Sequence, residues 1–465
     1  MTRSIKSVHI TNYYHKHSGG ISTSFNNLLA AAERHRRYVR LIVPGDSESV
    51  EDVNDFARIY YVPAKRSPII DKRYRVMMPW QYMLKGTVIR RILLAERPDM
   101  IEVTDKYTLS AIGPMIRTNN FKKLGRPMLV HFSCERMDDN IGSFMTRSRL
   151  GKALARYVIG NYTIPGFDFH LANSAYTAQE FFDSLNSEKN FRFTKRIFDI
   201  CWRFLKAPRV ALEDRIFICP RGVDSEHFSP NRLSNEVKQE MRAVADATET
   251  SILLLYAGRI SPEKNIGLLI DVMKILAKDE TRDFRLLVAG DGPKREWLKK
   301  QMEKYSPGKV VFLGHIEKEQ LADYYANADI FVHPNPKEPF GIAPLEAMAS
   351  GVPTVAPNAG GILSYANDNN AWLVEPSGEA FAEAIREVVD NAELRNSKVK
   401  AALAAARQNT REASTDHLLE TYDRIFADFN ERNDLYTDVE EPKTFNYWEL
   451  IRVSLVFACL FVYYS

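Results

Sequence analysis

Short apolar runs alternate with amphipathic stretches of helix length through both halves of the chain, and this rhythm limits the possible folds more than any other feature. The alternation is typical of parallel sheets covered by helices, because a strand buried on both faces is apolar along its length. Helices are expected over residues 265–278, 293–304, 317–326 and 378–390. The expected strands are SVHI, RLIVP, RIYYV, MIEVT, PMLVHF, FHLAN and RIFICP in the first half, and SILLLYAG, RLLVAG, VVFLG, IFVHP, PTVAP and AWLVEP in the second.

The rhythm breaks at a polar stretch around residues 225–250, so a chain of 465 residues is predicted to form two Rossmann-like α/β domains. We assign residues 1–225 to the first domain, residues 226–430 to the second and residues 431–465 to a C-terminal segment. Ligands of open parallel sheets bind beyond the carboxyl ends of the strands. Two such sheets facing each other would enclose a cleft, lined by the loops that follow strands.

The charges are unevenly distributed, because residues 1–225 carry an excess of Lys and Arg and the remainder an excess of Asp and Glu. A basic half predicts an anionic partner such as phospholipid head groups, nucleic acid or acidic glycans. The alternative is that these charges are scattered over a solvated surface. The 45% hydrophobic and 26% charged content excludes a disordered or fibrous chain. Four widely spaced cysteines and the lack of a leader-like apolar start favour a cytoplasmic protein.

The stretch EPFGIAPLEAMASG at residues 338–351 predicts a helix start that binds an anion between two acids. Pro344 fits the first turn of a helix that begins near Gly341, since the N–H it lacks would have no partner there. Free amides and the positive end of the helix dipole bind phosphate. Glu346 could then accept hydrogen bonds from a ribose and Glu338 from hydroxyls on the far side, so that the two acids hold opposite ends of a sugar nucleotide. The amides belong to Gly341, Ile342 and Ala343.

Cations and glycines follow other expected strands. In YAGRISPEKN, Arg259 and Lys264 flank a loop between a strand and a helix, where a guanidinium and an ammonium suit a diphosphate. Taken alone, they would be ordinary surface charges. Gly290 belongs to the turn VAGDGP, at the same edge of the same sheet. Gly19 and Gly20 follow the first strand and allow a ligand to approach the backbone closely.

His131 lies at the end of the run PMLVHF. A lone histidine at the end of a strand is commonly a structural residue. At the carboxyl edge of a sheet and facing a cleft, it could instead bond a sugar hydroxyl or manage charge near a reacting carbon. The residues alone leave both interpretations open.

In their order along the chain, the glycine pair, the histidine, GRISPEKN, GDGP and the two glutamates resemble the family 4 retaining glycosyltransferases of the GT-B fold. The likeness covers about residues 5–425. The stretches EVTDKYTL and VHFSCERMDD look like the branch of bacterial GDP-mannose-dependent mannosyltransferases that act on phosphatidylinositol or glycolipids. The resemblance implies two Rossmann-like domains facing each other across a cleft, with a C-terminal helical segment.

The resemblance also implies an enzyme that moves a hexose, with mannose from GDP-mannose as the first choice, to a lipid or glycan acceptor at the cytoplasmic membrane face. No nucleic-acid partner and no protein nucleophile are expected. The alternatives are a UDP-sugar-dependent enzyme of polysaccharide or glycolipid synthesis, a synthase or phosphorylase with a soluble acceptor, and a non-catalytic nucleotide-sugar-binding protein.

Each matching position takes a role from the family. The catalytic and sugar-binding set consists of His131, Arg259, Lys264 and Glu338, in which the two cations would stabilise the departing diphosphate. The donor-binding set consists of Gly19, Gly20, Gly290, Phe340, Gly341, Ile342, Ala343 and Glu346. The chain contains no Asp-x-Asp motif, so no metal and no cofactor beyond the nucleotide-sugar donor are expected.

Two features depart from the family pattern. Arg221 stands in CPRGVD where the family usually has Asn. Residues 186–210 mix cations with aromatic rings, and residues 453–464 form an apolar run too short to span a bilayer. Both segments could contact an anionic membrane. The alternatives are a helical hairpin that packs its rings on the first domain, and a tail that binds a partner or packs on the fold.

Overall fold

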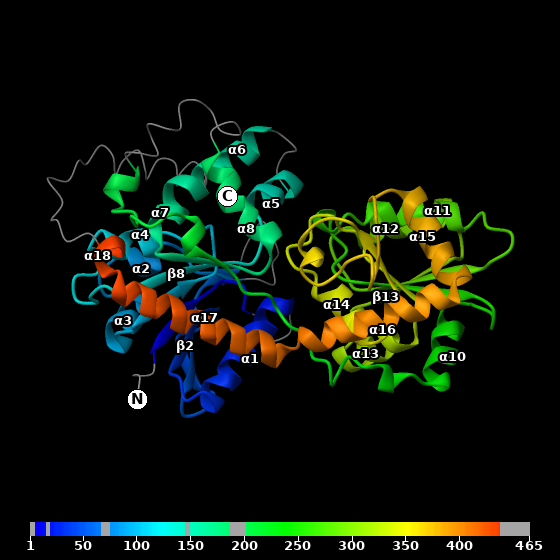
Figure 1. The fold of residues 1–465 in the computed structure, drawn as a ribbon, viewed down its shortest axis with the longest axis horizontal. Coiled ribbons are helices and arrows are strands. Elements are labelled where there is room, and N and C mark those ends of the chain that lie inside the picture. The colour runs from blue at the N-terminus through cyan, green and yellow to red at the C-terminus, as the bar shows by residue number, and fades with distance from the viewer. Residues whose placement is uncertain (1–4, 15–18, 67–74, 145–148, 187–200, 438–465) are drawn as a thin grey trace.

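The computed structural model describes residues 5–14, 19–66, 75–144, 149–186 and 201–437. The described residues form two α/β domains, each built around one sheet (Figure 1). The predicted pair of parallel sheets is therefore confirmed. The apolar run at residues 453–464 and residues 187–200 of the basic aromatic segment lie outside the described residues.

The first domain contains an eight-stranded sheet in the order β10-β9-β8-β7-β1-β2-β4-β3. Its strand pairs are parallel except for β3 with β4. A separate hairpin pairs β5 (Lys65–Arg66) with β6 (Arg75–Val76). The sheet strands are β1 (Ser7–Ile10), β2 (Val39–Gly45), β3 (Ser49–Asp52), β4 (Ala57–Pro63), β7 (Met100–Val103), β8 (Met128–Ser133), β9 (Phe169–Ala172) and β10 (Ile216–Ile218).

Helices cover both faces of this first sheet. Leu28 of α1 shares a core with Val130 of β8 on one face, whereas Ile89 of α3 shares a core with Leu129 on the other. Neighbouring residues of a strand thus enter different cores, as the pleat requires. The helices are α1 (Gly19–Arg34), α2 (Trp80–Met83), α3 (Val88–Glu96), α4 (Ile112–Arg117), α5 (Met137–Phe144), α6 (Arg149–Val158), α7 (Ile164–Gly166) and α8 (Ala175–Leu185), with a π-helical turn at Ile159–Thr163.

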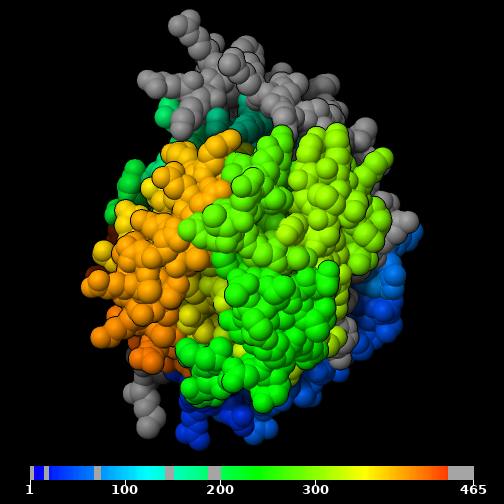
Figure 2. Space-filling view, turned by 90° about the vertical axis from the view of Figure 1, so that its right-hand side faces the viewer, coloured from blue at the N-terminus to red at the C-terminus, as the bar shows by residue number. Residues whose placement is uncertain are grey.

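The second domain contains a six-stranded parallel sheet in the order β13-β12-β11-β14-β15-β16. Its outer side forms the face shown in Figure 2, with α10, α11 and α12 in green. The strands are β11 (Ile252–Ala257), β12 (Phe284–Ala289), β13 (Val310–Gly314), β14 (Ile330–Val332), β15 (Thr354–Pro357) and β16 (Trp372–Val374). The helices are α10 (Asn235–Val244), α11 (Gly267–Leu276), α12 (Arg295–Tyr305), α13 (Lys318–Asn327), α14 (Ile342–Ala349), α15 (Gly378–Asp390) and α16 (Ala392–Gln408).

The chain returns to the first domain at its C-terminal side through α17 (Arg411–Glu431) and α18 (Asn433–Tyr436) (Figure 1). Tyr422 of α17 is buried in the core beneath α1 and donates a hydrogen bond to the carboxylate of Glu102 in β7. The range 226–430 predicted for the second domain includes α17, although this helix packs on the first sheet. The division of the chain at residue 225 stays a prediction.

The two connections between the domains run side by side. The N–H of Val223 donates to Asn409 O at 2.9 Å, and the N–H of Arg411 donates to Val223 O at 2.9 Å. A Cβ atom at Gly222 would lie 2.0 Å from Thr410 O, so only glycine allows this close approach. The two connections between the domains are therefore paired in parallel by a short backbone bridge.

The described end of the basic aromatic segment packs on the first domain. Trp202 and Phe204 border the core around Tyr162, and the Trp202 Nε1–H donates to Gly160 O at 2.9 Å. For residues 201–210 the structure supports the packing alternative over a membrane contact. In the part of the chain that the structure describes, no helix has the length and apolar character needed to cross a membrane.

Candidate active site

The loop and helix over residues 338–349 form the centre of the site. α14 begins at Ile342, after Gly341 in the left-handed region at φ +85°, and Pro344 lies in its first turn. The Tyr365 hydroxyl donates to Gly341 O, and the N–H of Gly361 donates to Glu338 O at 2.7 Å. The start of α14 is thus held in place by the neighbouring turn rather than by a side-chain cap, which leaves its first amides for an anion.

Glu338 forms an ion pair with Lys264, which lies at the end of a 3₁₀ turn (Pro262–Lys264) after β11. Lys264 Nζ lies 3.0 and 2.9 Å from the two carboxylate oxygens, and Asn335 Nδ2 donates to one of them at 3.0 Å. Burial alone would raise the pKa of Glu338, but the Lys264 ammonium and these hydrogen bonds hold it at about 2. Glu338 is therefore a fixed anion across the physiological pH range.

His333 is a site residue that the sequence analysis missed. It follows β14 at the carboxyl edge of the second sheet, and its Nε2 lies 3.8 Å from Glu338 Oε2. Burial and the nearby Lys264 ammonium lower the pKa of His333 to about 4, so the ring is neutral near pH 7. The run IFVHP contained the signal, since a histidine is its second-last residue, as in PMLVHF.

Glu346 lies one turn into α14, in a different electrostatic setting. Burial raises its pKa to about 7, against the opposing effect of the Arg411 guanidinium. The Tyr325 hydroxyl donates to Glu346 Oε2 at 3.3 Å. Asp224, which is bonded by Arg411 at 2.8 Å and by Lys318 at 3.1 Å, raises the pKa further. The two predicted acids therefore differ: Glu338 is permanently charged, whereas Glu346 titrates near neutrality.

Two glycine-containing loops meet beside this centre, after β11 and β12. A Cβ atom at Gly290 would lie 1.9 Å from Gly258 O, and the backbone at Gly290 has φ +139°. Tyr256 donates its hydroxyl proton to Arg259 O at 3.0 Å, which fixes the backbone of the neighbouring loop. Gly290 is thus required for packing of the loops, and Arg259 lies half-buried at the carboxyl edge.

The glycine pair brings the first domain to the second. α1 begins at Gly19, and a Cβ atom at Gly20 would lie 3.7 Å from Ile342 Cγ2 at the start of α14. Arg221 fixes this turn, because its Nη1 donates to Gly20 O at 2.5 Å and to Ser24 Oγ at 2.8 Å. The arginine that departs from the family pattern therefore braces the glycine turn opposite α14.

Two further contacts close the other side of the domain interface. Ser174, the N-cap of α8, donates its hydroxyl proton to Pro339 O at 2.5 Å. Lys337 Nζ lies 2.9 Å from Asp139 Oδ1 in α5. The loop that carries Glu338 is thus bonded by the first domain on both sides of that residue.

Comparisons with known proteins support a single interpretation. Residues 237–404 match the family described as Glycosyl transferases group 1. The chain is 28% identical over 83% of its length, and 88% of the relative, to a GDP-mannose-dependent alpha-(1-6)-phosphatidylinositol dimannoside mannosyltransferase of Mycobacterium tuberculosis (strain ATCC 25177 / H37Ra). A GDP-mannose-dependent alpha-mannosyltransferase of Corynebacterium glutamicum is 25% identical over 88% of the chain and 86% of the relative. Residues 237–404 therefore belong to this family, and the chain is a glycosyltransferase.

Solved structures show the fold of this glycosyltransferase. Sucrose-phosphate synthase from Thermosynechococcus elongatus superposes with a TM-score of 0.65 at 17% identity, over 91% of this chain and 100% of that one. Anabaena HepE in complex with UDP and glucose superposes with a TM-score of 0.61 at 16% identity, over 90% and 99%. The expected GT-B fold, with two α/β domains and C-terminal helices, is confirmed.

His131 does not lie where the sequence analysis placed it. β8 continues for two residues beyond it, and its ring is fully buried against Phe167, His170 and Phe181 of the glycosyltransferase. Neither ring nitrogen has a hydrogen-bond partner among the described residues. Burial lowers the pKa of His131 well below its usual value, so the ring is a neutral part of the core that does not face the cleft.

The first domain presents polar groups that sequence reasoning also missed. Glu135, just after β8, accepts hydrogen bonds from Tyr13 Oη at 2.9 Å and from Asn140 Nδ2 at 2.7 Å. Burial raises the pKa of Glu135, partly offset by Lys106. Lys106 in turn pairs with Glu180 at 2.5 Å inside the domain. The carboxyl edge of the first sheet of the glycosyltransferase is thus rich in hydrogen-bonding groups that suit a hydroxylated ligand.

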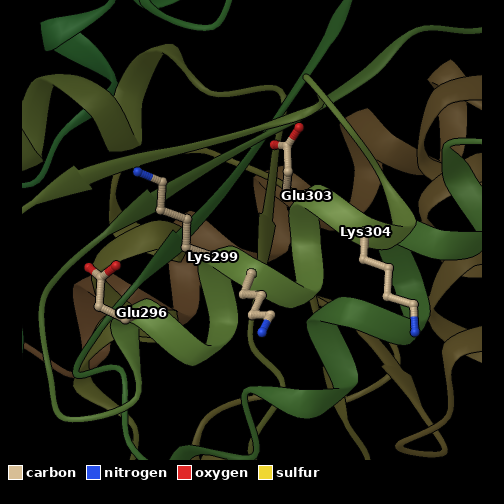
Figure 3. A pocket seen from close by; sticks show the side chains of 5 residues that line it. Glu296, Lys299, Glu303 and Lys304 are labelled. Carbon is tan, nitrogen blue, oxygen red and sulfur yellow. The ribbon is translucent and has the colours of Figure 1, made fainter.

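A separate surface hollow lies on α12 (Figure 3). It is lined by Glu296, Lys299, Lys300, Glu303 and Lys304. These are exposed charges on one solvent-facing helix, so the hollow plays no part in the site. In residues 5–14, 19–66, 75–144, 149–186 and 201–437, no cluster of His, Cys, Asp and Glu could hold a metal ion.

Proposed function

We propose that this glycosyltransferase moves mannose from GDP-mannose to a lipid or glycan acceptor at the cytoplasmic face of a membrane, with retention at the anomeric carbon. The start of α14 between Glu338 and Glu346 carries the proposal. Its backbone amides can bind the phosphates, and the acids on either side can accept hydrogen bonds from sugar and ribose hydroxyls. The printed activities of the mycobacterial and corynebacterial relatives support GDP-mannose as the donor. The mycobacterial relative is named for a phosphatidylinositol dimannoside acceptor.

In this proposal the donor lies on the second domain, residues 226–430, and the acceptor on residues 1–225. The amides from Phe340 to Ala343 bind the diphosphate, and Arg259 and Lys264 neutralise the charge that grows on it as the glycosidic bond breaks. Glu338, held ionised by Lys264, accepts hydrogen bonds from the hydroxyls of the transferred sugar. In this proposal Lys264 lies between the sugar and the diphosphate, so that its ammonium both holds Glu338 ionised and stabilises the leaving group.

Glu346 is proposed to accept hydrogen bonds from the ribose of the donor. Gly290 gives the diphosphate access to the backbone, and Gly19 and Gly20 do the same from the opposite domain, where Gly20 already lies against Ile342. His131 has no ligand role in this proposal, because its ring is enclosed by the core. The proton of the acceptor hydroxyl passes to a donor phosphate oxygen, so no protein nucleophile is required.

The second candidate is a UDP-sugar donor, which the structural match to HepE with bound UDP and glucose favours. Titration calorimetry of the purified full chain with GDP and with UDP separates the two. Tight binding of GDP supports mannosyl transfer, and tight binding of UDP supports the alternative. Binding of neither nucleotide by a folded sample would overturn the donor site and favour a non-catalytic protein.

A further inference from the structure

A run of apolar side chains is exposed on the first domain at α2. The exposed fractions are 54% for Trp80, 49% for Met83 and 61% for Leu84. Of the other large exposed apolar side chains in the described residues, Val50 and Val53 lie three residues apart, and the rest, such as Leu233 and Trp297, stand singly. Grouped apolar exposure of this kind marks an interaction surface, whereas single exposed residues are ordinary.

Cations lie beside this run, because the side-chain amide of Gln81 in α2 donates to Pro63 O, two residues before β5. Lys65 and Arg66 in β5 and Lys85 after α2 are exposed, and none of the three forms an ion pair with a described residue. The Arg90 guanidinium donates to both Met83 O and Asn120 O, which brings residue 120 near α2. Lys122 and Lys123 follow Asn120 in the chain. We call the set of Trp80, Met83, Leu84, Lys65, Arg66 and Lys85 the α2 patch.

The acids near the α2 patch are already neutralised. Asp46 pairs with Arg75, which also donates to Ala64 O beside β5. Glu48 pairs with Arg91 at 2.9 Å. Among the described residues, the unpaired charges of the α2 patch are therefore positive, which fits an anionic partner and agrees with the basic excess of residues 1–225.

The backbone beneath the patch is anchored to the carboxyl edge of the first sheet. Tyr82, fully buried between the exposed Trp80 and Met83, donates its hydroxyl proton to Thr108 O at 2.5 Å. The N–H of Met77 donates to Asn12 Oδ1 at 2.8 Å. Asn12 and Thr108 follow β1 and β7, so the patch adjoins the edge where the proposed acceptor binds. The inward Tyr82 keeps the neighbouring apolar side chains turned outward.

We propose that the α2 patch docks the enzyme on an anionic phospholipid bilayer. Trp80, Met83 and Leu84 enter the boundary between head groups and acyl chains, while the cations contact anionic head groups. The inference rests on the proposed lipid acceptor, which such docking would bring to the acceptor side of the cleft. It places the membrane contact on α2 and β5, rather than on residues 201–210, whose rings pack inward.

The test is flotation of the full chain with vesicles of neutral phosphatidylcholine, with and without half anionic phosphatidylglycerol. One variant carries Trp80→Ser, Met83→Ser and Leu84→Ser, and a second carries Lys65→Gln, Arg66→Gln and Lys85→Gln. Each cation near an anionic surface contributes about fivefold to binding. We expect either variant to reduce binding to anionic vesicles at least about tenfold, and the wild type to bind neutral vesicles weakly.

Matched controls change similar side chains on the second domain. Leu233→Ser with Trp297→Ser and Leu363→Ser removes comparable exposed apolar area, and Lys299→Gln with Lys300→Gln and Lys304→Gln removes three cations of α12 (Figure 3). Equal losses in the controls, or unchanged binding in the patch variants, would overturn the proposal. So would a wild-type dimer that the apolar variant dissociates in sedimentation, because the patch would then bind a second copy.

Calorimetry with GDP and UDP on the same variants separates this inference from the proposed function. The α2 patch contains no donor-site residue, so we expect nucleotide binding to be unchanged in both patch variants. Loss of vesicle binding with intact nucleotide binding supports docking through the patch. A wild type that binds vesicles through the patch but binds neither nucleotide would refute the proposed function and leave the docking surface standing.

Discussion

The titration of Glu346 makes the proposed ribose contact testable by pH. Burial raises its pKa to about 7, so below that pH the side chain in the free enzyme is a neutral carboxylic acid, whereas above it the donor meets a carboxylate. A hydrogen bond to a charged group contributes about 1.5–3 kcal/mol and a neutral one about 0.5–1.5 kcal/mol. The difference of about 1.4 kcal/mol is a factor of about ten in affinity.

We expect the donor dissociation constant to rise about tenfold between pH 8 and pH 5.5, with its midpoint near the pKa of Glu346. The ligand should be the intact nucleotide sugar, because both of its phosphates are esterified and neither titrates in this range. The neighbouring charges do not interfere: Asp224 has a lowered pKa, and the pKa of His333 is about 4.

Glu346→Gln is the matched variant, since it keeps the size of the side chain and removes its titration. Calorimetry across the same pH range should give a flat, weak affinity for this variant. Glu346→Ala should lose more than about tenfold in donor affinity and turnover at pH 8. A wild-type affinity independent of pH, or the same pH dependence in Glu346→Gln, would refute the ribose contact.

Three further outcomes are expected. His131→Leu should keep turnover within about threefold, and a loss of turnover would restore a catalytic role. Because the buried ring is neutral in the folded state and takes up a proton on unfolding, the wild type should lose thermal stability as pH falls below about 6.5, and the variant should lose less. Gly290→Ala should destabilise the fold by a few kcal/mol in denaturant titration, since its Cβ would meet Gly258 O, and normal stability would contradict that packing. Turnover should survive EDTA, and an activity that only Mg²⁺ or Mn²⁺ restores would contradict metal independence.

The two sheets could be predicted because their central strands, such as β7, β8 and β11, are buried on both faces. β11 is a continuous apolar run and β12 is apolar apart from Arg285, and such runs identify strands of parallel sheets without help from tertiary structure. β3 was missed for the opposite reason: its residues Ser49–Asp52 are all exposed on the antiparallel edge strand. The packing of α17 on the first sheet was not predicted either, because a helix-forming sequence does not reveal which of two sheets the helix will cover.

The donor loop was predictable in position but not in its contacts. Backbone rules placed Glu338 and Lys264 at the same sheet edge, yet their ion pair depends on loop conformations that neither segment determines alone. His131 shows the limit most clearly. The end of an apolar run was taken as the end of a strand, but β8 extends to Ser133, and the strand period then turns the ring at 131 into the core.

The return of α17 to the first domain also orders events in the synthesis of this enzyme. Domains commonly fold as they emerge, beginning at the N-terminus. Here Leu419, Tyr422, Ile425 and Phe429 complete the core that α1 begins, so one wall of the first domain is translated after the entire second sheet. A nascent chain that ends before residue 411 would expose the apolar face of α1 and the first sheet, so the first domain completes its core only after the last helix is released.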